Sequence, residues 1–94
     1  MVYVYPAIFT QYDSDIGIYF PDLDGCISRG DDYLDSFKSA RESLSLHLYS
    51  MIKEGYELPK PSRLEDIKLD ETEALALIET EDLDSFKPDW ELVE

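Results

Sequence analysis

The side chains best suited to chemistry in this sequence are carboxylates that lie close together in predicted turns. Asp13, Asp15 and Asp24 have the first, third and twelfth spacings of a calcium-binding loop. A glycine occupies the fifth position, where a ligand belongs, and an isoleucine the sixth, where glycine belongs, so we reject a calcium site. Asp22 and Asp24 could pair as a general acid and base, but turn formation explains their spacing more simply.

The single histidine and the single cysteine do not add a catalytic or metal site. His47 has no second histidine or thiolate pair with which to bind zinc, and Cys26 has no disulfide partner in the chain. The sequence has no glycine-rich phosphate loop, nucleophile elbow or HExxH motif. We therefore expect a protein that is not an enzyme and needs no metal or cofactor.

Charge is the strongest compositional signal. The chain has 22 acidic and 8 basic residues, a net charge of −14, and in residues 70–94 the only base is Lys87. Such a field repels nucleic-acid phosphates and attracts basic partners. We expect a basic protein partner and no direct nucleic-acid binding; the alternative is that the acidity serves solubility alone.

The sequence also predicts a cytoplasmic protein with no membrane segment. It has no run of about 18 apolar residues, and its start, MVYVYPAIFT, lacks the basic region of a signal peptide. A lone cysteine fits a reducing compartment.

The first thirty residues predict three strands. Residues 2–12 alternate with period two, so Tyr3, Tyr5 and Phe9 share one face, and residues 16–20 and 26–29 follow after turn sequences. Pro6 cannot donate a ladder hydrogen bond, which predicts an edge strand or a bulge. The Asp24-Gly25 pair predicts a tight turn in which glycine adopts positive φ.

Residues 32–54 predict one long helix, with an aspartate cap at its start and Gly55 at its end. The residues expected to face the sheet recur at spacings of three and four: Leu34, Phe37, Ala40, Arg41, Leu44, Leu48, Met51 and Ile52. The opposite face is small and polar, and it offers an alternative contact surface formed by Ser36, Ser39, Ser43, Leu46 and Ser50. A plain solvated face is the competing interpretation.

The last third of the chain is less regular. Residues 56–63 predict an extended linker because of two prolines, and Ser62 with Glu65 has capping-box spacing for a short helical turn. Residues 74–81 suit either a helix or a buried strand by composition, and we expect a strand. We expect one domain over residues 1–81 and a short acidic tail over 82–94, which Leu83, Phe86 and Trp90 would dock.

Residues 5–61 resemble the HicB-like antitoxin family. The similarity is carried by Tyr5-Pro6-Ala7-Ile8-Phe9, by Phe20-Pro21-Asp22-Leu23-Asp24-Gly25-Cys26, by Gly30-Asp31, Phe37, Ala40 and Leu44, and by Gly55 with Pro59-Lys60-Pro61. Asp24 stands where the family has proline. The resemblance implies an α+β, partial ribonuclease-H-like fold of order β-β-β-α-β, an antiparallel sheet with one long helix on one face, and it favours a strand at 74–81.

The resemblance also implies a function: neutralising a small basic mRNA-cleaving toxin of the HicA type by covering its RNA-binding surface. Many members carry a C-terminal DNA-binding segment, which we do not expect here. The alternatives are a stand-alone regulatory or structural domain of the same fold, and a remnant of a ribonuclease-H-like nuclease. We also expect a homodimer or higher homo-oligomer.

Charge and expected exposure select the residues that would contact a partner. They are Asp13, Asp15, Asp22 and Asp24 in the loops, and Glu79, Glu81, Asp82 and Asp84 near the end.

Overall fold

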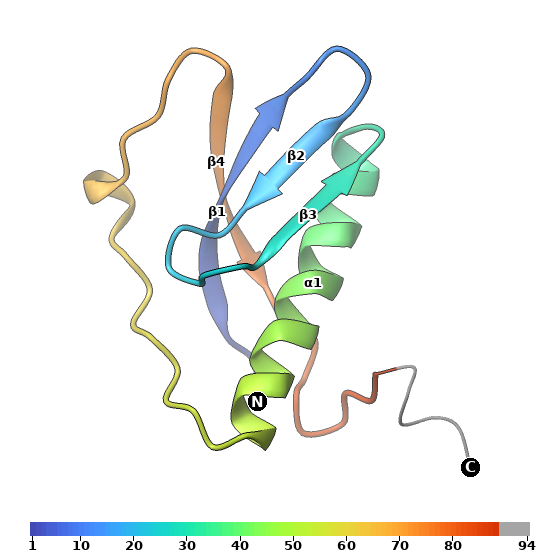
Figure 1. Cartoon of the computed structure of the whole chain (residues 1–94), viewed down its shortest axis with the longest axis vertical. Coiled ribbons are helices and arrows are strands. Elements are labelled where there is room, and N and C mark those ends of the chain that lie inside the picture. The colour runs from blue at the N-terminus through green and yellow to red at the C-terminus, as the bar shows by residue number, and fades with distance from the viewer. Residues whose placement is uncertain (89–94) are drawn as a thin grey trace.

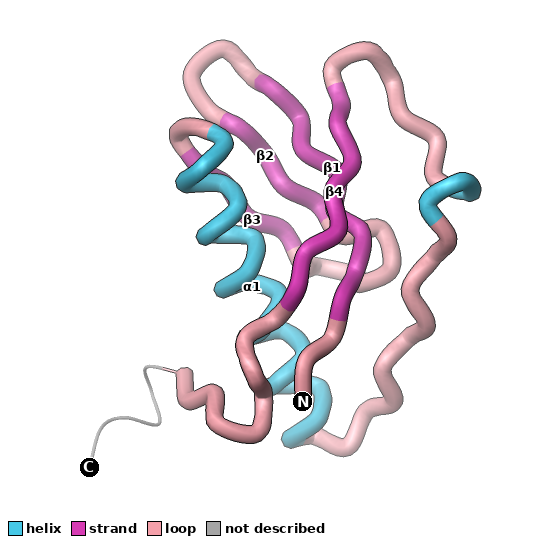
Figure 2. Tube along the Cα trace, turned by 180° about the vertical axis from the view of Figure 1, so that it is seen from behind, coloured by secondary structure: helices cyan, strands magenta, loops and turns pink. Residues whose placement is uncertain are grey.

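A computed structural model of the chain describes residues 1–88. Four antiparallel strands form one sheet, and a single long helix covers one of its faces (Figures 1 and 2). The elements are β1 (Val4–Gln11), β2 (Ile16–Tyr19), β3 (Ile27–Gly30), α1 (Tyr33–Lys53), the short 3-10 helix η1 (Leu64–Asp66) and β4 (Glu73–Glu79). The expected order β-β-β-α-β is confirmed, and the strand expected over residues 74–81 is present as Glu73–Glu79.

The core lies between the sheet and α1. The strand order is β3-β2-β1-β4, and β1 pairs with β2 from Ile8 and with β4 along most of its length. Alternate residues of β1 point toward the helix, and the buried cluster is formed by Tyr5, Ala7, Phe9, Ile16, Ile18, Phe20, Leu23, Cys26, Ala40, Leu44, Leu48, Ile78 and Leu83. The predicted shared face of Tyr5 and Phe9 is therefore the core face.

Local signals fix both ends of α1, as the sequence predicts. The Asp32 carboxylate accepts a hydrogen bond from the Asp35 amide at 2.8 Å. At the other end Gly55 has φ of 79°, and the amides of Gly55 and Tyr56 donate to the carbonyls of Ile52 and Met51. This is the glycine-terminated helix end that the sequence indicates.

The predicted core face of α1 is partly wrong. Leu34 is 76% exposed, and Phe37 and Ile52 are also exposed, whereas Ser36 and Ser45 are fully buried. For Ser36 the physical reason is a close approach of α1 to Gly30 of β3, where a bulky side chain has no room. Ser45 instead meets the segment after β4, since its hydroxyl accepts a hydrogen bond from the Glu81 amide at 3.0 Å. The two buried hydroxyls donate to the Asp32 and Arg41 carbonyls one turn earlier, at 2.6 and 2.7 Å, so neither loses a hydrogen bond on burial.

The prediction of an edge position for the first strand is also wrong. β1 is central, with β2 on one side and β4 on the other. Pro6 pairs with Leu77 of β4, but pairing with β2 begins only at Ile8. The strand therefore has one neighbour instead of two at Pro6, which makes a residue without an N–H tolerable there.

The segment after α1 runs extended alongside the sheet as far as η1. The short turn predicted near Ser62 exists as η1, but its start is Arg63 and it has no side-chain cap. Ser62 instead binds Asp22 of the β2–β3 loop through both its amide and its hydroxyl. The capping-box interpretation is wrong because a long-range partner competes successfully for the same serine.

Residues that follow β4 pack on the domain. Leu83 is 8% exposed and belongs to the core cluster, and its amide donates to the Met1 carbonyl at 2.8 Å. The Phe86 ring meets Tyr49 edge-on with centroids 5.5 Å apart. Two of the three predicted docking residues thus contact the domain, and Trp90 lies outside the described residues. No helix within residues 1–88 is long and apolar enough to cross a membrane.

Candidate functional site

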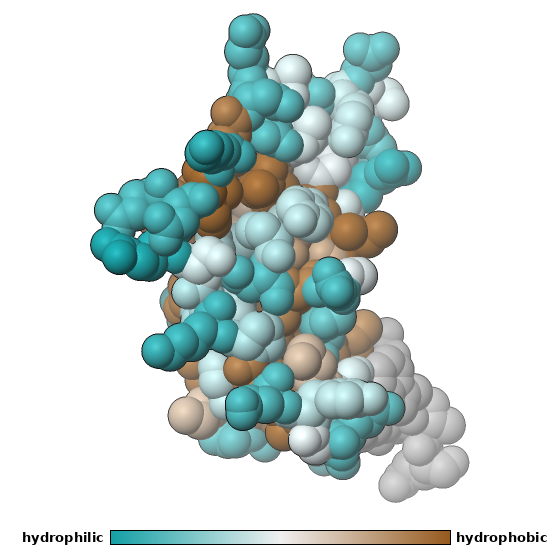
Figure 3. Space-filling model, turned by 60° about the vertical axis from the view of Figure 1, so that its left-hand side comes forward, coloured by the Kyte–Doolittle hydropathy of each residue, from teal (hydrophilic) through white to brown (hydrophobic). Residues whose placement is uncertain are grey.

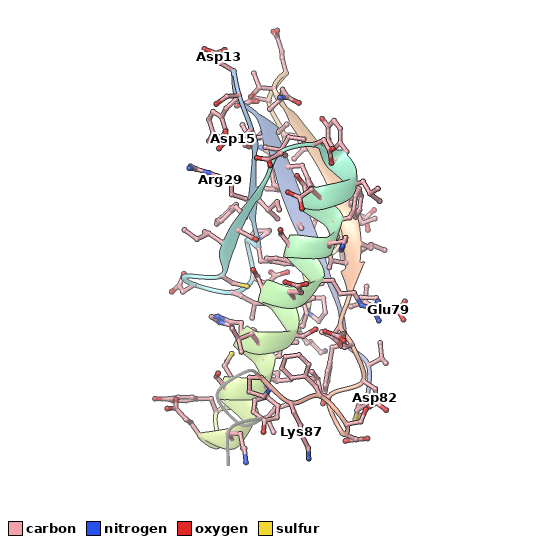
Figure 4. The ribbon with its side chains drawn as sticks, turned by 90° about the vertical axis from the view of Figure 1, so that its right-hand side faces the viewer. Asp13, Asp15, Arg29, Glu79, Asp82 and Lys87 are labelled. Atoms are coloured by element: carbon pink, nitrogen blue, oxygen red, sulfur yellow. The ribbon has the colours of Figure 1, made fainter. Side chains whose placement is uncertain are left out.

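The acidic residues proposed as partner contacts do not form one patch. Asp13 and Asp15 lie in the β1–β2 turn at one end of the molecule, and Glu79 and Asp82 lie toward the other end (Figure 4). Asp22 and Asp24 belong to the β2–β3 loop, and Glu81 and Asp84 follow β4. One partner that touches all eight would have to span the length of the domain.

Several of these carboxylates already have partners inside the chain. Asp15 lies 2.9 Å from the Arg29 side chain. The Met1 ammonium donates to Asp82 and, at 2.7 Å, to Asp84. The hydrogen bond from Met1 to Asp82 lowers the pKa of Asp82 below its ordinary value. The two Met1 contacts are exposed, and the Arg29 side chain is exposed as well, so we assign these contacts little stabilising effect.

Asp22 fastens the linker to the sheet. Its carboxylate accepts from the Ser62 amide at 2.8 Å and from the Ser62 hydroxyl. Nearby, the Tyr5 hydroxyl donates to the Pro59 carbonyl, and burial followed by the charge of Asp22 raises the pKa of Tyr5. The same prolines that prevent helix formation in the linker thus leave backbone groups free to bind the domain.

We expect Asp22→Ala to release the linker and to lower the free energy of unfolding by about 1 kcal/mol, since two hydrogen bonds to a half-buried carboxylate are lost. Amide hydrogen exchange at Ser62 and urea denaturation measure the two effects. Asp24→Ala, in the same loop but exposed, is the matched control. Unchanged exchange at Ser62 in Asp22→Ala would show that the linker is held by other contacts.

Exposed apolar residues alone do not select a binding site. Apolar surface appears in several patches among hydrophilic side chains on the face that Figure 3 presents. Exposed large apolar residues occur on most elements, from Val4 on β1 to Leu64 on η1. Scattered exposure of this kind is normal in a small domain, so hollows that combine apolar surface with charge are more informative.

The β3–α1 groove contains residues of the serine-rich helix face that the sequence offered as an alternative contact surface. It is more apolar than the hollow between α1 and the segment after β4. It has a volume of about 440 Å³ and is lined by Gly25, Cys26, Ile27, Ser43, Leu46, His47, Ser50, Met51, Glu54 and Tyr56. Ile27 is 69% exposed and Tyr56 62% exposed. Three residues of the predicted helix face line this groove: Ser43, Leu46 and Ser50. Ser39 is half-buried outside it, and Ser36 is buried between α1 and β3.

The charge of the β3–α1 groove is negative. Glu54 lines it and the exposed Asp24 precedes Gly25 in the chain, while none of its described lining residues is lysine or arginine. An apolar centre with acidic residues near its rim matches a partner that presents an apolar side chain surrounded by bases. Sequence reasoning missed Ile27 and Tyr56, whose exposure depends on how the elements are arranged.

A second hollow lies between α1 and the segment after β4, and it is less selective in charge. It contains the predicted residues Glu81 and Asp82 but also Arg41 and Lys87. Both signs of charge therefore face the same space. This hollow gives a basic partner no clear preference.

The cysteine that lines the groove is not activated as a nucleophile. Burial raises the pKa of the Cys26 thiol to about 11, so it is protonated at neutral pH and is a poor nucleophile. Within residues 1–88 no three histidine, cysteine or acidic side chains are placed to hold a metal ion.

Comparison with known proteins agrees with this geometry. The sequence model of HicB-like antitoxins of bacterial toxin-antitoxin systems matches residues 5–87. The chain belongs to the HicB-like antitoxin family. The resemblance seen in the sequence is thereby confirmed, and the match extends beyond the motif-bearing residues through β4 to the segment that packs on the core.

Individual relatives of this HicB-like chain include proteins known by sequence and by structure. A 14.9 kDa protein from the rep-hol intergenic region of Haemophilus phage HP1, whose function is uncharacterised, is 31% identical over 62 residues, which are 66% of this chain and 47% of the phage protein. The chain thus spans about half the length of that curated relative.

Two solved toxin-antitoxin complexes contain similar chains. A chain of the HicA3 and HicB3 complex is 29% identical, with a TM-score of 0.69 over 85% of this chain and 100% of that one. A chain of a complex from Streptococcus pneumoniae has a TM-score of 0.84 over all of this chain and 78% of its own, at 18% identity. The first supports the family assignment and the second the fold.

Proposed function

We propose that this HicB-like chain is an antitoxin that binds a small basic mRNA-cleaving toxin of the HicA type through the β3–α1 groove. Family membership and the similar chain in a HicA3 and HicB3 complex support a toxin partner. The observation that carries the choice of surface is the composition of the groove, which combines exposed Ile27 and Tyr56 with acidic Glu54 and has no lysine or arginine in its lining.

Neutralisation by this surface needs no chemistry on the toxin. A toxin surface that binds RNA phosphates is basic, and an acidic surface competes for the same side chains. Apolar contacts at Ile27 and Leu46 would then supply affinity that exposed charges alone do not give. Because the toxin's substrate is mRNA, the proposal places the antitoxin in the cytoplasm.

The competing functions are a regulatory domain without a toxin and a nuclease remnant. Co-expression separates them, because only an antitoxin restores growth to cells that produce the toxin encoded beside it. Magnesium-dependent RNA cleavage by the purified chain, abolished by Asp22→Ala, would favour the nuclease instead.

We expect Ile27→Asp to weaken toxin binding about 100-fold or more, since it places a charge in the apolar centre of the interface. Calorimetric titration of purified toxin into the full chain measures this change. The matched control is Leu64→Asp, which adds the same charge to an exposed leucine on η1, outside the groove. Ile27 is itself exposed, so the variant should keep its fold, which circular dichroism checks.

Equal affinity of the Ile27→Asp variant and the wild-type chain would exclude the β3–α1 groove but leave the antitoxin function standing. Absence of both binding and growth rescue for the wild-type chain would contradict the function itself. Binding that is weakened equally by both variants would show that the loss is not specific to the groove, since added negative charge by itself favours a basic partner.

A further inference from the structure

β3 forms one edge of the sheet, and this edge borders the β3–α1 groove. β3 stands at one end of the strand order and pairs only with β2 within residues 1–88. In Figure 1 it is the outermost strand on the side where α1 lies. Gly25 and Cys26, just before β3, and Ile27, its first residue, line the groove. One wall of the groove is therefore made by side chains of α1 and the other by the edge of a strand.

The hydrogen bonds between β2 and β3 show which backbone groups of β3 face outward. The Phe20 amide donates to the Cys26 carbonyl at 3.2 Å, so Phe20 and Cys26 form a hydrogen-bonded pair. Hydrogen-bonded and non-hydrogen-bonded pairs alternate along an antiparallel ladder. Ser28 therefore bonds to β2, whereas the amides and carbonyls of Ile27 and Arg29 point away from it.

The ladder on the other side of β2 agrees with this assignment. The Tyr12 amide donates to the Asp15 carbonyl at 2.8 Å, and alternation from that pair directs the backbone groups of Tyr19 to β1. Tyr19 lies opposite Ile27 and thus offers it no hydrogen bond. Within residues 1–88 no hydrogen bond outside the ladders reaches the amide of Ile27 or of Arg29, and both residues are exposed.

The charges around this edge favour a basic partner. Edge strands are commonly protected by their own charged side chains. The charged residue of β3 is Arg29, which Asp15 balances at 2.9 Å. In the neighbouring groove Glu54 is the charged lining residue, and no lysine or arginine lines it. The opposite edge, β4, borders a hollow lined by bases and by an acid, Lys38, Arg41 and Glu79, so charge there selects neither kind of partner.

We propose that the basic toxin binds the β3–α1 groove with an extended segment that pairs with the edge of β3. This inference rests on the proposed function and adds the mode of binding to it. Main-chain hydrogen bonds to Ile27 and Arg29 give affinity, and alternate side chains of the segment give specificity.

The alternation of side chains fixes which residues of the segment enter the groove. Ile27 points to the face of the sheet away from α1, because its neighbour Cys26 faces the core. The toxin residue opposite Ile27 points the same way, and the residues on either side of it point toward α1. An apolar residue at one of these positions fills the groove beside Leu46, and a base close to it in sequence meets Glu54.

Amide hydrogen exchange of the full chain, followed by NMR with and without the purified toxin encoded beside it, tests the pairing. In the free chain we expect rapid exchange at Ile27 and Arg29 and slow exchange at Ser28, which bonds to β2. With the toxin bound, we expect exchange at Ile27 and Arg29 to slow at least about tenfold, because both amides then donate to carbonyls of the toxin.

Arg29→Pro and Arg29→Ala provide a matched pair of variants. Both remove the side chain and its charge, but only proline removes the outward N–H, and an edge strand tolerates proline where the N–H faces solvent. We expect Arg29→Pro to bind the toxin about tenfold or more weakly than Arg29→Ala in calorimetric titration, since a toxin carbonyl loses its donor. Circular dichroism checks that both variants are folded.

Equal affinities of the two Arg29 variants, or rapid exchange at Ile27 and Arg29 in the complex, would overturn the strand pairing. If Ile27→Asp still weakens binding in that case, the proposed function stands and the toxin uses side-chain contacts alone. A wild-type chain that does not bind the toxin would overturn both proposals. Slow exchange at both amides in the free chain, together with a dimeric mass by light scattering, would show that a second copy occupies the edge instead.

Discussion

Replacing Phe20 by alanine is expected to lower the free energy of unfolding by about 3–5 kcal/mol, the range for truncating a fully buried phenylalanine. Phe20 has no exposed surface and lies in the core cluster. Its backbone also closes the β2–β3 loop, since its amide donates to the Cys26 carbonyl at 3.2 Å and its carbonyl accepts from the Leu23 amide at 3.1 Å. For a 94-residue domain this loss approaches the whole stability.

Urea denaturation followed by circular dichroism measures the change. Tyr19→Ala is the control, because Tyr19 is the preceding residue, points to the opposite face of β2 and is 50% exposed. We expect it to cost about 1 kcal/mol or less. Similar losses for the two variants would contradict the assignment of Phe20 to the core.

The second large effect is expected for Gly30→Ala, which we expect to destabilise the domain by about 2–3 kcal/mol through overpacking. A Cβ atom at Gly30 would lie 2.6 Å from the backbone N and Cα of Ser36. Because these are backbone atoms, trimming the serine side chain cannot relieve the contact. The helix would have to move away from β3, and thermal denaturation would report the loss.

Gly25 provides a control that separates crowding from backbone conformation. A Cβ atom at Gly25 meets nothing within 4 Å, but its φ is 78°. We expect Gly25→Ala to cost about 1 kcal/mol and Gly25→Asn to cost less, because asparagine tolerates that conformation better. At Gly30 the larger asparagine should be worse than alanine. The opposite order at Gly30 would contradict the close approach of α1 to β3.

The F-P-D-L-D-G-C segment therefore links the fold to the proposed binding surface. Phe20, Leu23 and Cys26 enter the core, Asp22 holds the linker, and Gly25 allows the turn that leads into β3. The next residue, Ile27, is exposed in the β3–α1 groove. Damage to the motif is thus expected to weaken toxin binding even where the altered residue does not touch the partner.

The amino-acid sequence alone determines the elements and their order. Asp32 and Gly55 delimit α1 because capping depends on groups within a few residues of each helix end. Period-two alternation likewise groups Tyr5 and Phe9 on one face of β1, but the packing of α1 decides that this face is the core. The motif residues also indicate the family, which resolves the helix-or-strand ambiguity of residues 74–81.

Tertiary structure decides which of these elements meet. β1 is central because it pairs with β4 as well as with β2. The pairing with β4 places Val4 opposite Glu79, and no local sequence pattern specifies a contact between residues so far apart in the chain. The approach of α1 to β3 buries Ser36 and exposes Leu34, opposite to what hydrophobicity predicts. The β3–α1 groove arises in the same way, from side chains that are distant in sequence and whose exposure depends on the packing of the helix across the sheet.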